Sequence, residues 1–365
     1  MNLRNIARIP LGMIAGLLGL ALSVPAALIL LPFGFTGLMT RALRRLLEPR
    51  LVEWEDVIEF VPQVGWRTKP NLDVHVRDFN SDAYHVTTGP DGWRGHHQLA
   101  EADVVAIGDS YAFGCGVDDA DFFAHQDGDI RIKAVGSPAY SMVHCVLWME
   151  RLAPELHGKL VVWFVYHGND LADNLHPALL HYRSPFARSD PETGDWEIAS
   201  AHVDQSRWTV NSREGEMQAF IEICSPTHQS VRAFEACEFL IRRGAEVCRD
   251  AGARLVVVSI PDLSHVARLA LARSLEQSEH AGHFDEDMPD RELKAISGRA
   301  GIPFVALRDH MDEADYLERD FHWSPRGNRK VARLIEDLSR SSSPMDDSPR
   351  SASVSEPAAR EASAV

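Results

Sequence analysis

The chain has 365 residues, 45% of them hydrophobic, and is therefore long enough to bury a sizeable core in one large domain or two small ones. Its formal net charge of −16 disfavours contact with phosphate backbones, so we expect no nucleic-acid partner. The odd number of cysteines and their lack of metal-ligand spacing predict neither a disulfide scaffold nor a zinc site. Several of the five lie in apolar surroundings, as small core residues do: Cys115, Cys145, Cys224, Cys237 and Cys248.

The N-terminal segment is predicted to be a membrane anchor. After a short basic N-terminus (1–8), residues 9–40 carry no charge and consist mostly of Leu, Ala, Ile, Gly and Val. About 20 apolar residues span a bilayer. A cleaved signal peptide is the alternative, but apolar sequence continues beyond Ala26-Ala27, which favours an uncleaved single-pass segment.

The side of the membrane stays open. Arginines flank the segment on both sides, and the excess after it favours a cytoplasmic location for the rest of the chain. The margin is small, however, and two prolines inside the segment allow a re-entrant shape. The flanking arginines are Arg4 and Arg8 before the segment and Arg41, Arg44, Arg45 and Arg50 after it.

Residues 41–98 are predicted to form a connecting region with short strands. Strand-like pieces occur at Leu72–Val76 and Tyr84–Thr88, and turn residues follow at 89–92. At the other end of the chain, residues 341–365 are rich in Ser, Pro, Ala, Asp and Glu without apolar periodicity, which predicts a disordered tail.

Between these ends, buried strands alternate with helices. One helix is indicated by apolar residues at spacings of three and four from Val231 to Cys248, with Gly252 at its end, and another follows Gly327. This alternation predicts an α/β fold with a parallel sheet, whose ligands bind beyond the carboxyl ends of the strands. The predicted strands are Asp103–Ile107, Ile130–Val135, Leu160–Tyr166, Leu255–Ile260 and Pro303–Leu307.

Four pieces of sequence at these strand ends could carry chemistry. The first strand leads into Gly108-Asp109-Ser110, which places Ser110 near the start of a helix, although such a turn also occurs as a simple helix cap. The second ends at Gly136, where a backbone N–H could approach a ligand closely. The third leads into Gly168-Asn169-Asp170, where an Asn side chain could donate to an oxyanion or form an Asx turn.

The fourth piece is Asp320-Phe321-His322, between the last strand and the last helix. A carboxylate two residues before a histidine can fix the ring's tautomer, and the histidine can then remove a serine proton. A surface ion pair would have the same sequence. Its position at the same sheet edge as the other pieces favours the catalytic interpretation.

In this order the four pieces resemble the SGNH (GDSL-like) hydrolase superfamily over roughly residues 100–340. The resemblance implies a flavodoxin-like, three-layer α/β/α catalytic domain (99–340) with a five-stranded parallel sheet. It also implies a nucleophile, a general base and an orienting acid at Ser110, His322 and Asp320, in that order. The implied oxyanion donors are the N–H groups of Ser110 and Gly136 and the side chain of Asn169.

The sequence departs from the common pattern of that superfamily in small ways. The usual acid stands three residues before the histidine, where this chain has Arg319. Asp320 has the spacing of some polysaccharide-modifying relatives, and Asp315 is a fallback. Gly168 is shifted by one position relative to Asn169, and Tyr111 replaces a leucine.

Residues 171–228 are predicted to be an insertion that forms a lid or a wall of the substrate site. It contains Tyr182, Trp196 and Trp208, which could stack on a sugar ring or pack in the core. His96-His97 and the scattered carboxylates show no ligand spacing, so we expect no metal and no cofactor.

The predicted function is serine-dependent ester hydrolysis or acyl transfer. The resemblance and the anchor favour an ester on a cell-envelope carbohydrate, and a lipid-linked or small-molecule ester is also open. A cytoplasmic domain acting on a lipid-linked precursor is a variant of the same prediction. The alternative is a membrane-tethered binding or assembly protein that has kept the fold but lost turnover. Retention of the serine, glycine, asparagine and histidine together favours the enzyme.

Overall fold

The computed structural model describes residues 51–77, 82–126, 128–179, 182–199 and 213–341. The predicted anchor (9–40), its flanking arginines and nearly all of the predicted tail lie outside these residues. Within the described ranges, no helix combines the length and the apolar character needed to cross a bilayer.

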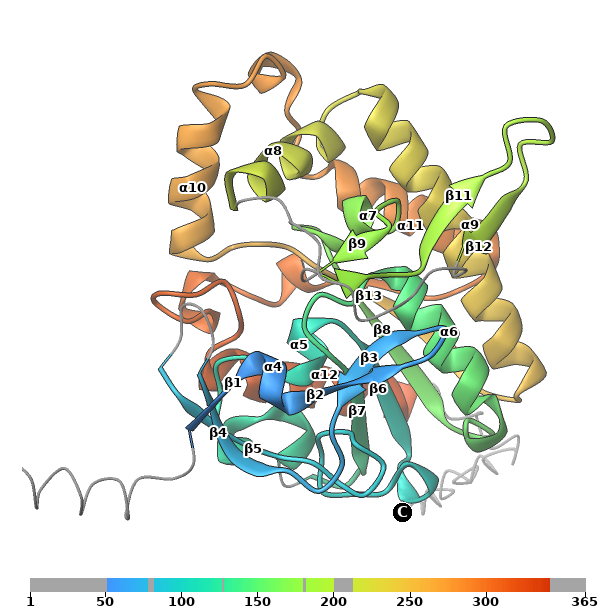
Figure 1. Cartoon of the computed structure of the whole chain (residues 1–365), viewed down its shortest axis with the longest axis vertical. Helices are drawn as coiled ribbons and strands as arrows, with labels where there is room; N and C mark the ends of the chain where they lie inside the picture. Colours follow the sequence, from blue (N-terminus) through green and yellow to red (C-terminus); the bar gives the residue numbers. More distant parts are fainter. Residues whose placement is uncertain (1–50, 78–81, 127, 180–181, 200–212, 342–365) are drawn as a thin grey trace, which may run out of the picture.

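A five-stranded parallel sheet forms the centre of the molecule (Figure 1). Its strand order is β14-β13-β8-β6-β7. Numbered along the chain among themselves, these strands run 2-1-3-4-5 across the sheet, which is the flavodoxin-like order. The predicted α/β class and parallel sheet are thus confirmed. The strands are β6 (Val104–Gly108), β7 (Ile132–Gly136), β8 (Leu160–Tyr166), β13 (Arg254–Ile260) and β14 (Phe304–Ala306).

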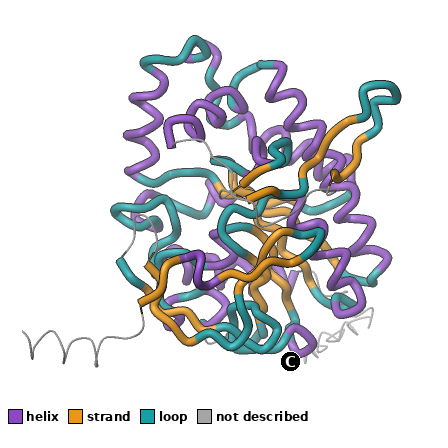
Figure 2. Tube along the Cα trace, in the orientation of Figure 1, coloured by secondary structure: helices purple, strands orange, loops and turns teal. Residues whose placement is uncertain are grey.

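Helices cover both faces of this sheet, because consecutive residues of its central strands point to opposite sides. On β8, Val161 and Trp163 belong to one hydrophobic core, whereas Val162 and Phe164 belong to a second. Figure 2 shows the strands running between the helices. The first core is covered by α6 (Met142–Leu152), α9 (His228–Asp250) and α11 (Met288–Ala300), and the second by α12 (Pro325–Ser341).

Helix α9 illustrates how the sequence specifies these elements. Thr227 caps its first turn by accepting a hydrogen bond from the Ser230 N–H. The helix buries Phe234, Cys237, Ile241 and Cys248 along one stripe, as the spacing predicts, but Val231, which the same spacing includes, is 54% exposed. It ends just before Gly252, whose φ of 71° suits a glycine.

The region from residue 51 to 98 packs onto the first core. Strands β1 (Leu51–Glu53), β4 (Asp73–Arg77) and β5 (Tyr84–Thr87) form one small sheet, and β2 (Ile58–Val61) pairs with β3 (Gly65–Thr68). Strands β4 and β5 lie where the sequence predicts strand-like pieces. The predicted boundary between residues 98 and 99 stays a prediction.

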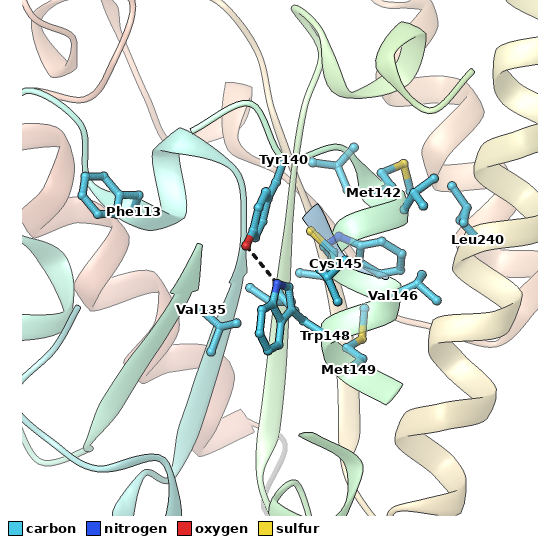
Figure 3. Close-up of a cluster of buried hydrophobic side chains, with 14 of the residues drawn as sticks. Phe113, Val135, Tyr140, Met142, Cys145, Val146, Trp148, Met149 and Leu240 are labelled. Carbon is cyan, nitrogen blue, oxygen red and sulfur yellow. Dashed lines mark hydrogen bonds between the residues drawn. The ribbon is translucent and has the colours of Figure 1, made fainter. Parts of the chain in front are cut away.

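Aromatic side chains join this region to α6. The Tyr140 hydroxyl donates to the Trp66 carbonyl and accepts from Trp148 Nε1 at 2.9 Å, the contact drawn in Figure 3. The Trp66 Nε1 donates to the Pro138 carbonyl at 3.2 Å. Trp54, in the short helix α4 (Trp54–Val57), packs edge-on against Phe113 with ring centroids 5.1 Å apart. The N-terminal region therefore shares one core with the sheet.

Arg94 provides a polar connection between the same two parts. Its guanidinium is 1% exposed and donates to the Asp119 carboxylate at 2.7 Å. The other donors reach backbone carbonyls on both sides of the connection, which gives each of the five N–H groups of the fork an acceptor. These carbonyls belong to His85, Phe113, Gly114 and Val117.

The segment predicted as an insertion contains more secondary structure than its sequence pattern indicates. It comprises α7 (Asp170–Asp173), the paired strands β9 (Ala178–Leu179) and β10 (Tyr182–Arg183), the hairpin of β11 (Phe186–Ser189) and β12 (Trp196–Ala199), and α8 (Arg213–Ile223). The hairpin projects past α9 in Figure 1. Helix α8 contacts α10 (His265–Leu275), which follows β13.

Of the three aromatic residues that the sequence places in this segment, the structure describes the surroundings of one. The Trp196 ring is half-buried and has the Arg232 guanidinium over its face, 4.8 Å from the centroid. Arg232 also donates to Ser189 Oγ at 2.7 Å. Trp196 thus fastens the hairpin to α9. Trp208 and the side chain of Tyr182 lie outside the described residues.

The five cysteines are buried and free, which confirms their assignment to the core. Burial raises the pKa of Cys145, Cys224 and Cys237 far above its usual range and that of Cys248 to about 12. These thiols are therefore protonated and unreactive in the folded protein.

Candidate active site

Ser110 begins the short helix α5 (Ser110–Phe113) directly after β6. Gly108 leaves little room at this turn, because a Cβ there would lie 3.0 Å from the Phe164 Cβ and 3.1 Å from the Ala112 Cβ. Asp109 caps the helix by accepting a hydrogen bond from the Tyr111 N–H at 3.0 Å. The Ser110 side chain is therefore fixed at the carboxyl edge of the sheet.

His322 meets Ser110 from the other end of the domain. Its Nε2 lies 2.7 Å from Ser110 Oγ, although 212 residues separate the two in the sequence. The Asp320 Oδ1 lies 3.1 Å from His322 Nδ1, and the two side chains are 2% and 6% exposed. The structure thus brings together the serine, histidine and carboxylate that the sequence singled out, in the order a proton transfer requires.

Aromatic contacts fix the loop that carries His322. The Tyr111 hydroxyl donates to the Phe321 carbonyl at 2.6 Å, which links α5 to this loop. The Tyr111 ring lies 5.1 Å from the His322 ring and 4.8 Å from the Trp323 ring. The Tyr111 hydroxyl thus supplies a hydrogen bond that a leucine at this position could not.

Asp315, the fallback acid, has other partners. Its Oδ2 pairs with Lys330 Nζ at 2.5 Å and accepts from the Asp312 N–H at 2.8 Å. Its Oδ1 lies 3.2 Å from Arg326 Nε. This buried carboxylate therefore ties the start of α12 to the preceding turn, and Asp320 is the acid beside the histidine.

The predicted oxyanion donors lie on neighbouring elements. Gly136, at the end of β7, has no room for a side chain, because a Cβ would lie 2.7 Å from the Ala112 Cβ and 2.8 Å from the Asp109 carbonyl oxygen. The strand that ends at Gly136 therefore packs closely against the helix of Ser110. The role of the Gly136 and Ser110 N–H groups as oxyanion donors stays a prediction.

Asn169 directs its amide to a neighbouring carboxylate. Its Nδ2 donates to Asp173 Oδ2 at 2.8 Å, and it forms no side-chain cap on α7, so the Asx-turn alternative does not hold. An amide nitrogen carries two hydrogens, so one remains for another acceptor. The preceding turn follows Tyr166, and a Cβ on Gly168 would collide with the Tyr166 ring.

Tyr166 is itself held by a carboxyl group that the sequence analysis did not single out. Its hydroxyl donates to Asp262 Oδ2 at 2.8 Å. Asp262 follows β13 directly, and burial raises its pKa. Its position just past a strand end could have marked Asp262 as a candidate site residue, but no recognisable motif surrounds Asp262 in the sequence.

A second serine–histidine pair lies elsewhere in the core. Ser184 Oγ is 3.0 Å from His144 Nε2, a distance similar to that of the first pair. The His144 Nδ1 accepts the Ser141 N–H, so Nε2 carries the proton and donates to Ser184. Burial lowers the pKa of His144 to about 3. This histidine cannot take a serine proton, and the pair instead fastens the insertion to α6.

The described part of the chain contains no group of three or more His, Cys, Asp or Glu side chains arranged to hold a metal ion.

Comparison with known proteins places this geometry in a family context. Residues 224–364 match the family model described as an SGNH hydrolase-like domain of the acetyltransferase AlgX. The match includes Asp320 and His322, whereas Ser110, Gly136 and Asn169 precede it. This stretch of the chain is therefore similar to an SGNH hydrolase-like domain. No curated protein matches the sequence of this SGNH-like chain.

Similar solved structures are distant. A protein from Lactobacillus plantarum is 11% identical, with a TM-score of 0.40, covering 66% of this chain and 97% of its own. A GDSL-like lipase from Bacteroides thetaiotaomicron is 13% identical, with a TM-score of 0.36 and coverage of 68% and 92%. An acetyl xylan esterase from Butyrivibrio proteoclasticus is 10% identical, with a TM-score of 0.31 and coverage of 65% and 63%. At these scores the likeness supports no argument about mechanism.

Proposed function

We propose that the SGNH-like chain hydrolyses or transfers an ester-linked acyl group, with Ser110 as nucleophile, His322 as general base and Asp320 as the orienting acid. One observation carries the proposal: Ser110 Oγ lies 2.7 Å from a histidine nitrogen whose other nitrogen lies 3.1 Å from a buried carboxylate. A serine is a weak nucleophile until an adjacent base removes its proton.

The reaction would proceed in two halves. Ser110 Oγ attacks the ester carbonyl carbon while its proton passes to His322 Nε2, and Asp320 stabilises the imidazolium. The ester C–O bond then breaks, and the imidazolium returns the proton to the leaving alcohol. Water or a sugar hydroxyl next attacks the acyl-enzyme, giving up its proton to His322. The bond between the acyl carbon and Ser110 Oγ then breaks, and the imidazolium returns this proton to Oγ. The N–H groups of Ser110 and Gly136 and the Asn169 amide would stabilise the oxyanion.

The proposed substrate is an acyl ester on a cell-envelope carbohydrate. The acetyltransferase named in the matching family description supports acetyl as the acyl group. The same set of side chains serves hydrolysis and transfer, since only the acceptor of the acyl group differs. Acetate release compared with acetyl transfer to an added oligosaccharide would distinguish the two.

Hydrolysis of p-nitrophenyl acetate by the full chain tests the nucleophile, together with labelling by a fluorophosphonate probe. We expect Ser110→Ala and His322→Ala each to lower kcat by about 10³-fold or more and Ser110→Ala to abolish labelling. Ser184→Ala is the matched control, because Ser184 is also a buried serine beside a histidine. Its variant should stay labelled and within about threefold of the parent.

The competing function is a binding or assembly protein with the same fold. It would give folded protein that neither turns over the ester nor reacts with the probe at Ser110. That result would contradict the enzymatic proposal.

We also infer that residues 9–40 tether this domain to a membrane, on the grounds of their length and lack of charge. The full chain should then stay with the membrane fraction after an alkaline carbonate wash, whereas a chain lacking these residues should be released. A reporter fused after α12 would determine the side.

A further inference from the structure

The Ser110 hydroxyl has two potential acceptors. His322 Nε2 lies 2.7 Å from Oγ, and Asp109 Oδ2 lies 3.3 Å from the same atom. A serine has one proton, so the shorter contact takes it and the Asp109 carboxylate stays beside the reacting oxygen. The other oxygen of Asp109 is the one that caps α5 through the Tyr111 N–H.

Asp109 is buried without a permanent cation. Its side chain is 1% exposed, and in the described ranges it forms no ion pair with a lysine or arginine. An unpaired carboxylate is unfavourable in such a place, so its charge has to be offset by something nearby. The His322 imidazolium that forms during the reaction would offset it, because a positive charge on His322 favours ionised Asp109.

The other titratable groups around Asp109 do not supply a positive charge. They come from each neighbouring element: Tyr111 on α5, Tyr166 at the end of β8, Asp170 at the start of α7 and Cys145 on α6. Burial, and after it the charge of Asp109, raise the pKa of Asp170 well above its usual range, and Asp170 supplies no positive charge in either protonation state. Burial likewise keeps the two phenols and the thiol protonated.

We propose that Asp109 is a second catalytic carboxylate, whose negative charge acts with that of Asp320 to stabilise the His322 imidazolium formed when Ser110 loses its proton. This inference rests on the proposed function and deepens it. Asp320 lies on the Nδ1 side of the ring and Asp109 lies beside Oγ on the Nε2 side, so the cation forms between two carboxylates.

Ionisation of Asp109 is part of the proposal. A neutral Asp109 would offer no charge to the imidazolium, and its O–H would donate to Ser110 Oγ and occupy a lone pair needed for attack. Burial raises the pKa of Asp109 to about 6, which puts this change in a range where it can be followed. Activity should therefore require two deprotonated groups, Asp109 and His322.

Substitution by asparagine separates the charge from the helix cap. An asparagine side chain at this position has nearly the same shape and can still accept the Tyr111 N–H, because Asn and Asp are equally good caps. Asp109→Asn thus keeps the cap but removes the charge and places an N–H donor beside Ser110 Oγ, as protonation of Asp109 would, whereas Asp109→Ala removes both the cap and the charge. If capping alone mattered, the asparagine variant would behave like the parent.

The experiment measures kcat, KM and the rate of fluorophosphonate labelling of Ser110 against pH, using the full chain and its Asp109→Asn variant. We expect the variant to lose about 10-fold or more in kcat at neutral pH, with KM changed by less than about threefold. In the parent, the acid limb of kcat/KM should approach a second-order dependence on proton concentration, and in the variant a first-order one.

Each outcome has one meaning. A parent without labelling at any pH contradicts the proposed function itself. A labelled parent with a first-order acid limb overturns the role of Asp109 without any variant, as does an Asp109→Asn variant with the kinetics of the parent. An equal loss at every pH and an unchanged order of the acid limb would assign Asp109 a structural role only, and would also overturn the inference.

Discussion

At the scale of single residues, the Asp109 carboxylate that we propose to assist catalysis also lowers the stability of the folded protein when it is ionised. Its backbone leaves β6 and its side chain caps the next helix, while burial raises its pKa from 3.8 to about 6. A group with a raised carboxyl pKa binds its proton more tightly in the folded than in the unfolded chain. The stability it confers is therefore complete below the unfolded pKa and is lost as pH rises through the folded one.

This linkage predicts that Asp109→Asn stabilises the protein at high pH. A shift of about two units corresponds to about 3 kcal/mol, since one unit is worth about 1.4 kcal/mol. The difference in unfolding free energy between variant and parent should grow by about that amount between about pH 4 and about pH 8. Urea unfolding at both pH values measures it, and a constant difference would show that Asp109 is not a buried, uncompensated charge.

Asn169 gives a second prediction at this scale. Its amide is oriented by Asp173 at 2.8 Å, so removal of the amide should affect the transition state more than removal of its support. We expect Asn169→Ala to lower kcat by about 10²-fold with little change in KM, as loss of an oxyanion donor does. Asp173→Ala should lower kcat by only about fivefold, because Asn169 then keeps its donor but loses its orientation. Equal losses in the two variants would argue against this assignment.

The residues of the site were accessible to sequence reasoning to different degrees. Ser110 stands next to a recognisable strand end, Asp320 and His322 lie between the last strand and the last helix, and the structure brings these residues together. The contact between Asp109 and Ser110 depends on side-chain rotamers and burial, which the sequence does not encode locally. Ser184 and His144 show the converse, because the tautomer set by the Ser141 N–H and the low pKa of the buried His144 exclude this pair from catalysis.

At the scale of elements, the buried strands were the most predictable feature. Each predicted strand of the sheet lies within two residues of an observed one, because Val- and Ile-rich runs buried on both faces have few other conformations. The short strands β9 to β12 were missed. They have two to four residues each and pack through single contacts such as Trp196 with Arg232, which give no periodic pattern.

Substitution of Arg94 tests how strongly the buried guanidinium stabilises the contact between these elements. Lysine has one compact charge in place of a planar fork, so Arg94→Lys leaves several of the buried carbonyls around α5 without a donor. We expect a loss of about 3 kcal/mol or more in unfolding free energy. Arg131→Lys is the control, because the Arg131–Asp103 pair is solvent-exposed and should change stability by less than about 1 kcal/mol. Similar losses in urea unfolding for both variants would contradict the role given to Arg94.

At the scale of the whole molecule, the N-terminal strands and the sheet share one hydrophobic core. Trp54 and Trp66 pack against Phe113 and Tyr140. A chain that starts at residue 99 lacks both tryptophans and would leave the rings of Phe113 and Tyr140 exposed. We expect a fragment of residues 51–341 to unfold cooperatively on heating and a fragment of residues 99–341 to lack a fixed tertiary structure. Near-ultraviolet circular dichroism distinguishes them, and a cooperative 99–341 fragment would place the domain boundary at residue 98.

Because all five cysteines are buried, their reaction with an alkylating reagent reports local opening of the structure. A thiol that stays protonated behind a packed helix reacts with an alkylating reagent only when that part of the structure opens. Cys145 lies on α6, Cys237 and Cys248 lie on α9, and Cys224 follows α8. The order in which a mass spectrometer finds them modified would therefore rank the elements of the unaltered chain by how often each one opens.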